Sequence, residues 1–351
     1  MIPFAEHKID ALLVSAPANV RYLCGFTGSN GLLLVTPDSQ TLFTDPRYTI
    51  QASEECRARV KAVKTISKGY LDVAAMELVR KKRLKRVGFE AGRVIFDSYQ
   101  RLKQALPLAA SLKPIAPVID KLRMIKSDAE IARIRRSVLA NSEAFAATVP
   151  SMRPAISEND IAAELEFAMR RLGAEKPAFE TIVASGARTA LPHAQPTHQK
   201  LAVNELLLID MGTCLNGYMS DMTRMLFLGN PNSRVRKIYN AVLEAQMAGI
   251  AAVRAGVKAL EVDRRARQVL RSNGLGKEFV HSTGHGLGLE IHESPRIGKN
   301  EATTLEAGMV ITLEPGAYIR DFGGVRIEDT VLVTKSGCEV LTPTPKELVL
   351  L

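Results

Sequence analysis

HSTGHGLGLEIHESP (281–295), VITLEPG (310–316) and GGVRIED (323–329) are the stretches of sequence from which the rest of the chain can be interpreted. They contain three of the six histidines, and they place two glutamates, Glu314 and Glu328, beside apolar, strand-like sequence. Burying an unpaired charge is expensive, so carboxylates and imidazoles beside apolar strands need partners. We therefore expect a metal site whose remaining ligands come from elsewhere in the chain.

The expected remaining ligands lie upstream, in LLLIDMGTCLNGYMSDMTRMLFLG. Asn216-Gly217 is a strong signal for a two-residue hairpin turn. Such a turn pairs Asp210 with Thr223, and it places Asp221 diagonally from Asp210 on the same sheet face. Like-charge repulsion would raise the pKa of one of these carboxyl groups sharply unless a cation lies between them. The sequence thus predicts a second pair of acids for the site.

Glu314 and Glu328 form the other pair, because a short hairpin through Asp321–Gly324 places them roughly opposite each other. A plainer alternative exists for each pair. One aspartate could cap a turn while the other pairs with Arg224, and Arg326 or Lys335 could neutralise a glutamate. Two hairpins that each present two acids favour the metal interpretation.

The number of charges suggests two ions. Two divalent cations carry about +4, which balances four carboxylates and leaves a nearly neutral cage for a hydroxide that bridges the two ions. Oxygen ligands alone suit manganese, magnesium or calcium, and one imidazole shifts the preference toward manganese, iron, cobalt or zinc. We expect a histidine as the fifth ligand.

Composition narrows the class of protein. With 351 residues, 46% hydrophobic and 24% charged, the chain is long enough for two globular domains. No apolar run is long enough to cross a membrane, and the charged N-terminus does not resemble a signal peptide. Four scattered cysteines without a C-x-x-C pattern fit reduced thiols in the cytoplasm. The net charge of +10 is dispersed, apart from Arg80–Arg83, so we expect no nucleic-acid partner and no membrane partner.

Strand and helix signals alternate over the first 120 or so residues, which predicts an α/β domain with a mixed or parallel sheet. Prolines at 107, 114 and 117 suggest a connection over 107–126, so we place the domains at 1–122 and 123–351. A capping box at Ser127 begins one helix of the second domain, and Ser157-x-x-Asp160 precedes a second helix. Further helices over 234–254 and 259–273, with strands at 182–185, 205–211, 220–228, 309–314 and 325–333, make this domain α+β.

The phrases DMGTCLNGYMSDMTR, HSTGHGLGLEIHE, LEPG and RIED resemble, in order and context, the ligand motifs of the pita-bread metallopeptidases. NVRYLCGFTGSN (19–30) and TDPRY (44–48) resemble the accessory domain that this family shares with creatinase. Across essentially the whole chain the resemblance is to the Xaa-Pro branch, aminopeptidase P and prolidase. It implies a creatinase-like N-terminal α/β domain, a pita-bread catalytic domain and a homodimer.

The resemblance also assigns roles to residues. It implies that Asp210 holds one ion, that His285 and Glu314 hold the other, and that Asp221 and Glu328 bridge both. Glu314 would also carry the proton, and Arg326 would orient the site carboxylates. His281 and His292 would polarise the substrate carbonyl and stabilise the oxyanion, with His193 nearby. Tyr218 is expected to support the site.

The activity so implied is hydrolysis of the bond between an N-terminal residue and a penultimate proline, with two divalent ions, by preference Mn²⁺ (or Co²⁺, Zn²⁺ or Fe²⁺). Arg296 could bind the carboxylate of a terminal proline, as a dipeptidase requires, or form an ordinary loop salt bridge. The choice between aminopeptidase and dipeptidase stays open. Two other interpretations are a catalytically inactive binding module and a creatinase-like amidinohydrolase, and the complete ligand set argues against both. The glycines of Gly284–Gly288 lack the spacing of a phosphate loop, and we expect them to allow close approach to the substrate.

Overall fold

The computed structural model describes residues 2–351 and divides the chain into two compact units, Met1–Arg123 and Met124–Leu351. Each unit has hydrophobic clusters of its own. Within the described residues, none of the helices is both long and apolar enough to cross a membrane. The four cysteines are not joined by disulfides.

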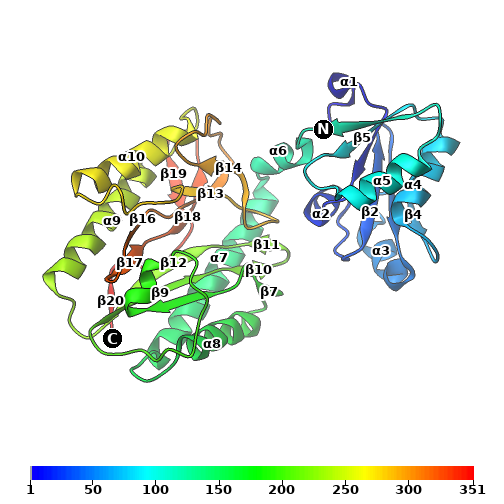
Figure 1. The fold of residues 1–351 in the computed structure, drawn as a ribbon. Coiled ribbons are helices and arrows are strands. Elements are labelled where there is room, and N and C mark those ends of the chain that lie inside the picture. Colours follow the sequence, from blue (N-terminus) through cyan, green and yellow to red (C-terminus); the bar gives the residue numbers. More distant parts are fainter. Residues whose placement is uncertain (1) are drawn as a thin grey trace. The chain divides into compact units, whose positions relative to one another are not determined.

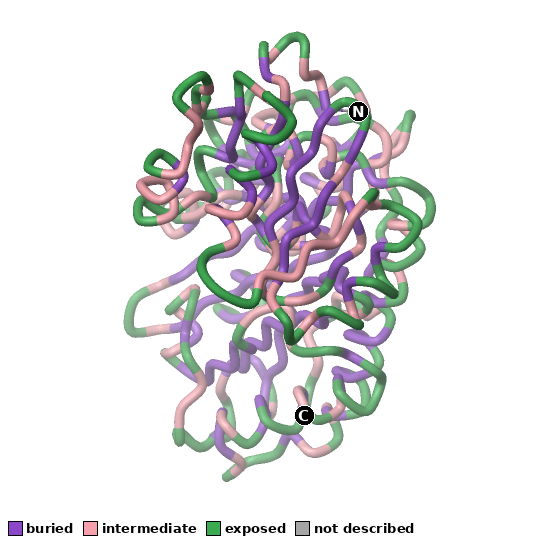
Figure 2. The backbone as a smooth tube through the Cα atoms, turned by 90° about the vertical axis from the view of Figure 1, so that its right-hand side faces the viewer, coloured by how far each residue is buried: buried purple, intermediate pink, exposed green. Residues whose placement is uncertain are grey.

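A six-stranded sheet with the order β4-β3-β2-β1-β5-β6 forms the centre of the first unit. Strand β2 runs antiparallel to its neighbours β1 and β3, whereas the β3–β4, β1–β5 and β5–β6 pairs are parallel. The sheet is therefore mixed, which is one of the two predicted alternatives. Figure 2 shows the buried residues concentrated along its central strands. The elements are α1 Phe4–His7, β1 Ala11–Val14, α2 Pro17–Cys24, β2 Gly31–Thr36, β3 Ser39–Thr44, η1 Pro46–Tyr48, α3 Thr49–Cys56, β4 Ala62–Thr65, α4 Leu71–Lys81, β5 Arg86–Glu90, α5 Phe96–Ala105, β6 Ser111–Ile115 and α6 Val118–Met124.

The proline-rich segment 107–126 differs from the prediction, since it is not merely a connection. Residues Ser111–Ile115 form the edge strand β6, in which Pro114 pairs with Phe89. Proline cannot donate to a strand ladder, and an edge strand tolerates it because one side of the strand has no neighbour. The segment then continues as helix α6.

Two helix pairs enclose the sheets of the second unit (Figure 1). Helices α7 Asp128–Thr148 and α8 Glu158–Arg171 start after Ser127 and Ser157. The predicted capping box at Ser127 is present, and Ser157 forms another with Asp160. Helices α9 Ser233–Ala252 and α10 Ala259–Ser272 match the predicted ranges to within two residues. The short helices η2 Val149–Ser151 and η3 Gly186–Ala190 complete the set.

The largest ladder of the second unit joins β9 (Glu205–Met211) to β12 (Met222–Leu228). Leu206 and Leu208 of β9 pack into the core under α9 and α10, while Leu207 and Ile209 pack into the core under α7 and α8. This period-two alternation buries both faces of the sheet. With β8 (Ile182–Ser185) and β20 (Val349–Leu350) it forms the sheet β20-β12-β9-β8.

A second sheet of this unit has the order β14-β13-β15-β18-β19. Its strands are β13 Gly284–Gly286, β14 Glu293–Ile297, β15 Val310–Leu313, β18 Asp329–Val333 and β19 Cys338–Val340. Two smaller sheets contain β7 Lys176–Pro177, β10 Thr213–Leu215 and β11 Tyr218–Met219, and β16 Gly316–Ile319 with β17 Gly323–Arg326.

The prediction of one continuous strand over 325–333 was wrong. The segment forms β17 and β18, which belong to different sheets, and Ile327 and Glu328 lie between them. Ile327 is fully buried in the core under α9 and α10, while the Glu328 side chain turns toward other acids. Periodicity alone could not reveal the break, because both halves are apolar and strand-like.

Candidate metal centre

The Asn216-Gly217 hairpin delivers two acids, as predicted. Both turn residues have positive φ, 51° and 77°, which a type I′ turn requires and which asparagine and glycine tolerate. Asp210 pairs with Thr223 in the β9–β12 ladder, so the predicted register is confirmed. Asp221 lies just before β12 and is 5% exposed. Beyond Met211 the strands leave this sheet, and β10 and β11 continue the hairpin in another.

Glu314 and Glu328 occupy the interruption between two strand pairs. Leu313 pairs with Asp329 on one side of it, and Gly316 pairs with Arg326 on the other. The two glutamates therefore take opposite positions, as the hairpin interpretation required. Glu328 is 1% exposed, and its Oε2 accepts a hydrogen bond of 2.7 Å from the hydroxyl of Thr223. This bond links the glutamate pair to the aspartate hairpin.

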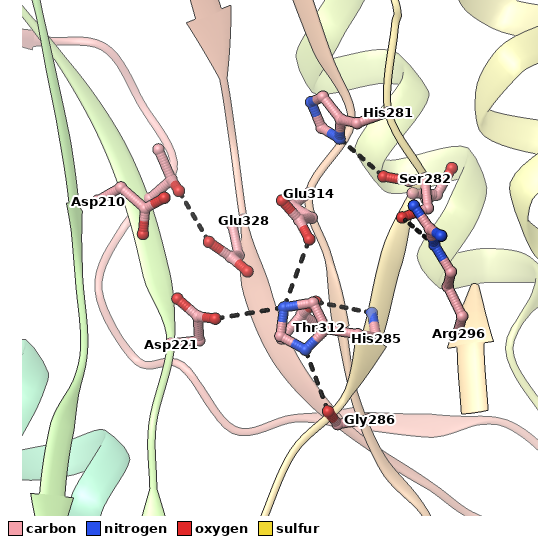
Figure 3. Close-up of polar contacts among 12 residues, drawn as sticks. Asp210, Asp221, His281, Ser282, His285, Gly286, Arg296, Thr312, Glu314 and Glu328 are labelled. Atoms are coloured by element: carbon pink, nitrogen blue, oxygen red, sulfur yellow. Dashed lines mark hydrogen bonds and ion pairs between the residues drawn. The ribbon is translucent and has the colours of Figure 1, made fainter. Parts of the chain in front are cut away.

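His285 brings an imidazole to these acids from β13 (Figure 3). Its Nε2 lies 3.5 Å from a carboxylate oxygen of Asp221 and 3.5 Å from one of Glu314. Its Nδ1 lies 3.0 Å from the carbonyl of Gly286, which fixes the tautomer with the proton on Nδ1 and the lone pair of Nε2 toward the acids. Burial lowers the pKa of His285 to about 4, so the ring is neutral at pH 7, as a metal ligand must be.

The electrostatics of this cluster favour a cation. Burial, together with the charges of Glu328 and Asp210, raises the pKa of Asp221 well above its ordinary value. Burial and the charge of Glu314 do the same for Glu328. Burial also raises the pKa of Glu314 to about 8, against the opposing effect of Arg326. Acids held together in this way stay ionised only if positive charge joins them.

Two orphaned atoms support the fit of a metal. Among residues 2–351, the buried Asp210 Oδ1 and Glu328 Oε1 have no hydrogen-bond partner. Ligand atoms of Asp221, His285 and Glu328 all lie within 4.8 Å of one another. Carboxylate oxygens with an imidazole are a ligand set for divalent transition ions. The residues present therefore suit such ions.

Arg326 ties the aspartate side of the site to the histidine side. It is 2% exposed, and its Nη2 donates to Asp210 Oδ2 at 2.6 Å. Its Nη1 donates to the Tyr318 hydroxyl at 2.8 Å, and that hydroxyl lies 2.8 Å from His281 Nε2. Because His281 Nδ1 lies 2.8 Å from the Ser282 carbonyl, both ring nitrogens of His281 have partners. Burial lowers the pKa of His281 to about 4, consistent with a neutral ring.

Tyr318 was not predicted as a residue of the site. A tyrosine at a buried strand position needs a partner for its hydroxyl, and this requirement was the available signal. Tyr218, which was expected to support the site, donates to Glu130, the acid of the Ser127 capping box. It therefore links the hairpin to the start of α7.

The two remaining histidines lie at the exposed side of the cluster. The His292 ring meets the His285 ring edge-to-face at 4.4 Å between centroids. His193 is exposed in the loop after η3. Burial is the main cause of the lowered pKa values of His281 and His292, and the proximity of His193 adds to both shifts. A hydrogen bond of 3.1 Å from Arg326 to the Pro192 carbonyl fastens this loop to the site. The structure thus gathers residues from five separate segments.

The glycines beside His285 approach the protein's own strands. A Cβ on Gly284 would lie 2.0 Å from the Thr312 carbonyl oxygen, and one on Gly286 would lie 2.5 Å from that of Ser294. These positions need glycine so that β13 can lie between β14 and β15. Close approach of these glycines to the substrate stays a prediction.

Four acids and a neutral imidazole lie close together here, and such a set suits divalent metal ions that activate water for hydrolysis. Comparison with known proteins agrees. Residues 132–335 match metallopeptidase family M24, and residues 4–125 match the creatinase/prolidase N-terminal domain. The chain belongs to the M24 metallopeptidases.

Its relatives cover the whole chain. It is 39% identical to an Xaa-Pro dipeptidase of Pyrococcus furiosus over 98% of this chain and 96% of that protein. The structure of an Xaa-Pro dipeptidase from Bacillus anthracis is similar at a TM-score of 0.95, with 38% identity, over 99% of this chain and 97% of that one. An X-Pro aminopeptidase from Thermotoga maritima is similar at a TM-score of 0.90, with 34% identity and 98% of each chain covered.

Proposed function

We propose that this protein is an Xaa-Pro dipeptidase, a metallopeptidase that releases a C-terminal proline from a two-residue substrate. The observation that carries the choice of dipeptidase is Arg296 on β14. Its Nε donates to the Ser282 hydroxyl at 3.1 Å, and among the described residues its two terminal nitrogens have no hydrogen-bond partner. It lines a cavity of about 340 Å³ together with His281 and Ser282. A guanidinium held in this way presents two parallel N–H groups to a carboxylate.

The proposed ligands are Asp210 for one ion, His285 and Glu314 for the other, and Asp221 and Glu328 for both. When bound, divalent ions would supply Lewis-acid activation of the attacking water and of the substrate carbonyl. We propose Mn²⁺ as the ion, because the set contains four carboxylates and one imidazole.

Glu314 is the proposed carrier of the proton that must reach the departing proline nitrogen. Its side chain is 17% exposed, more than those of Asp221 (6%) and Asp210 (12%), so it is the acid most accessible to substrate.

We propose that His193, His281 and His292 lie around the scissile carbonyl of the bound substrate. We propose that His292, which is exposed whereas His281 is half-buried, donates a hydrogen bond to the oxyanion. His281 would join it only by exchanging its contact with Tyr318 or Ser282. Arg326 would hold Asp210 in its ligand orientation.

We also propose a cytoplasmic homodimer with the domains 1–122 and 123–351. The absence of disulfides among the four cysteines supports a reducing compartment. The dimer rests on the family resemblance and is tested by light scattering.

The test compares Xaa-Pro dipeptides with Xaa-Pro-Xaa peptides. Arg296→Met should lower kcat/KM for the dipeptide about 10- to 100-fold, mainly through KM, since a charge-assisted contact contributes about 1.5–3 kcal/mol. Lys299→Met, which removes a charge from the same cavity, is the matched control. Equal or faster cleavage of the longer peptides by the wild-type protein would indicate an aminopeptidase.

Metal dependence is tested separately. Asp221→Ala should lose bound metal and activity together, because it removes a proposed bridging ligand. Full hydrolysis of an Xaa-Pro bond by this variant after chelation would refute the metal mechanism.

A further inference from the structure

A cluster of three charged side chains and one glutamine lies next to the proposed ligand Glu328. None of its members is a proposed substrate contact. It consists of Arg224 on β12, Asp329 on β18, Gln246 on α9 and Lys346 in the C-terminal segment. The side chains of Arg224 and Asp329 are 1% and 0% exposed. Charged groups are rarely buried this deeply unless every one of them is paired. The reaction has no use for them, so their contacts must explain their presence.

Arg224 uses all five of its N–H groups. It donates to Asp329 at 2.7 Å and to four backbone carbonyls, those of Thr223, Glu328, Thr344 and Pro345, at 2.6–2.9 Å. The carbonyl of Glu328 belongs to a proposed bridging ligand. Thr223 supplies the hydroxyl that holds the carboxylate of the same glutamate. Arg224 therefore fixes Glu328 at its backbone and supports the strand that fixes its side chain.

Asp329 joins Arg224 to the C-terminal segment. Its Oδ1 accepts from Arg224, and its Oδ2 accepts from Gln246 at 2.8 Å and from Lys346 at 2.5 Å. Lys346 also donates to the amide oxygen of Gln246 at 3.1 Å. Removing one partner of a buried ion pair leaves the other uncompensated, so each member holds the others in position.

Thr330, the residue after Asp329, supports the other proposed bridging ligand, Asp221. Its hydroxyl donates to the Asp221 carbonyl at 2.9 Å. Thr330 thus holds the backbone carbonyl of Asp221, and Arg224, the ion-pair partner of Asp329, holds that of Glu328.

The C-terminal segment completes the cluster, although it lies about 120 residues after Arg224 in the sequence. Its Thr344 and Pro345 carbonyls accept from Arg224, and the Tyr239 hydroxyl donates to the Lys346 carbonyl. Beyond Lys346, the strand β20 pairs in parallel with β12, joining Val349 to Leu226. The segment is therefore attached to the strand that follows Asp221.

We infer that Arg224, Asp329 and Lys346 are positioning residues that set the separation of Asp221 and Glu328, and that the C-terminal segment 344–351 is part of the support of the metal centre. The inference rests on the proposed metal site. A purely structural cluster would stabilise the fold without affecting how tightly or in what geometry an ion is held, and this difference can be measured.

Lys346→Met tests the inference because Lys346 is the most accessible member, 19% exposed, and its loss leaves Arg224 paired with Asp329. The full-length protein is freed of metal and titrated with Co²⁺, following heat release and the visible absorption of the bound ion. Replacing a residue that supports a ligand should weaken Co²⁺ binding about 10-fold or more and change the absorption bands. Lys346→Arg should restore both.

Lys335→Met is the matched control, since Lys335 is an exposed lysine of the same unit. It should bind Co²⁺ as the wild-type protein does. Gln246→Leu removes one hydrogen bond from Asp329 without changing the charge, and it should shift Co²⁺ affinity in the same direction by less. Thermal unfolding of each metal-free variant shows that the protein is folded.

Wild-type Co²⁺ affinity and absorption in both Lys346→Met and Gln246→Leu would overturn the inference, whatever their melting temperatures, because the cluster would then be structural only. A wild-type protein that bound no Co²⁺ would instead refute the metal site itself and the inference with it. Weaker Co²⁺ binding in Lys346→Met and Gln246→Leu, with wild-type binding in Lys335→Met, supports the positioning role.

Discussion

In the metal-free protein, the free energy of unfolding of the catalytic unit should fall as the pH rises from about 6.5 to about 8. Without metal, Asp221, Glu314 and Glu328 have raised pKa values in the folded state, about 8 for Glu314. They keep protons that the unfolded chain has released by about pH 5. The unfolded state then binds fewer protons than the folded state, so the free energy of unfolding falls as the pH rises toward the folded-state pKa.

The histidines set the lower limit of this window. Burial lowers the pKa values of His281 and His285 from 6.5 to about 4. Their contribution to stability is present above the ordinary value of 6.5 and is lost as the pH falls toward 4, which opposes the trend of the acids. As the pH rises above 6.5, the histidines become neutral in the unfolded state as well, so their opposing contribution fades and the acids dominate the change in stability.

The expected magnitude follows from the number of protons retained. One proton changes the free energy of unfolding by about 1.4 kcal/mol per pH unit, so one proton shared among the three acids gives about 2 kcal/mol across the window. For a unit of this size, about 1 kcal/mol corresponds to about 2–4 °C. The melting temperature of the chelated protein should therefore fall by about 4–8 °C.

The assay is calorimetric unfolding at three pH values, with metal content measured in each sample. The metal-loaded protein is the first control, and it should show a flat or rising melting temperature because bound cations stabilise the ionised acids. Glu314→Gln is the second, and it should flatten the fall in the chelated protein. A metal-free wild-type protein whose melting temperature stayed constant or rose from about pH 6.5 to 8 would refute the reasoning.

Three further predictions concern single side chains. Tyr318→Phe should lower the free energy of unfolding by about 1–3 kcal/mol in urea titrations, because it leaves His281 Nε2 without its partner; no loss would mean that another group replaces the hydroxyl. Gly284→Ala should destabilise the protein by about 3 kcal/mol or more in the same assay, since its Cβ would lie 2.0 Å from the Thr312 carbonyl oxygen. Gly337→Ala is its control, and because the space around Gly337 is open it should change stability by less than about 0.5 kcal/mol. Ser127→Ala should lose about 1 kcal/mol of unfolding free energy by removing the cap of α7, and a loss below about 0.3 kcal/mol would contradict the role of that capping box.

Local signals were sufficient for much of this structure. The capping boxes at Ser127 and Ser157 begin helices, and Asn216-Gly217 fixes the pairing of Asp210 with Thr223. Each of these features depends on residues a few positions apart, so the backbone dihedral preferences and hydrogen bonds that decide it can be read directly from the chain.

The partners of the buried cations could not be predicted in this way. The sequence left open whether Arg224 pairs with an aspartate of the hairpin and whether Arg326 pairs with Glu314 or Glu328. In the structure Arg224 pairs with Asp329, and Arg326 pairs with Asp210. Each choice depends on which strands become neighbours, and residues more than 100 positions apart leave no periodic signal of that.

The sequence by itself determined the hairpins, the caps and four acids as candidates for one site, because short-range geometry and residue chemistry specify them. The choice of His285 as the fifth candidate rested on the resemblance to the metallopeptidase family. Only the tertiary structure decided that 325–333 breaks into two strands at Glu328, that Tyr318 joins Arg326 to His281, and that the C-terminal segment supports the cage. The physical reason is that burial and pairing are properties of the packed chain, since a charge selects its partner only after the strands around it have excluded water.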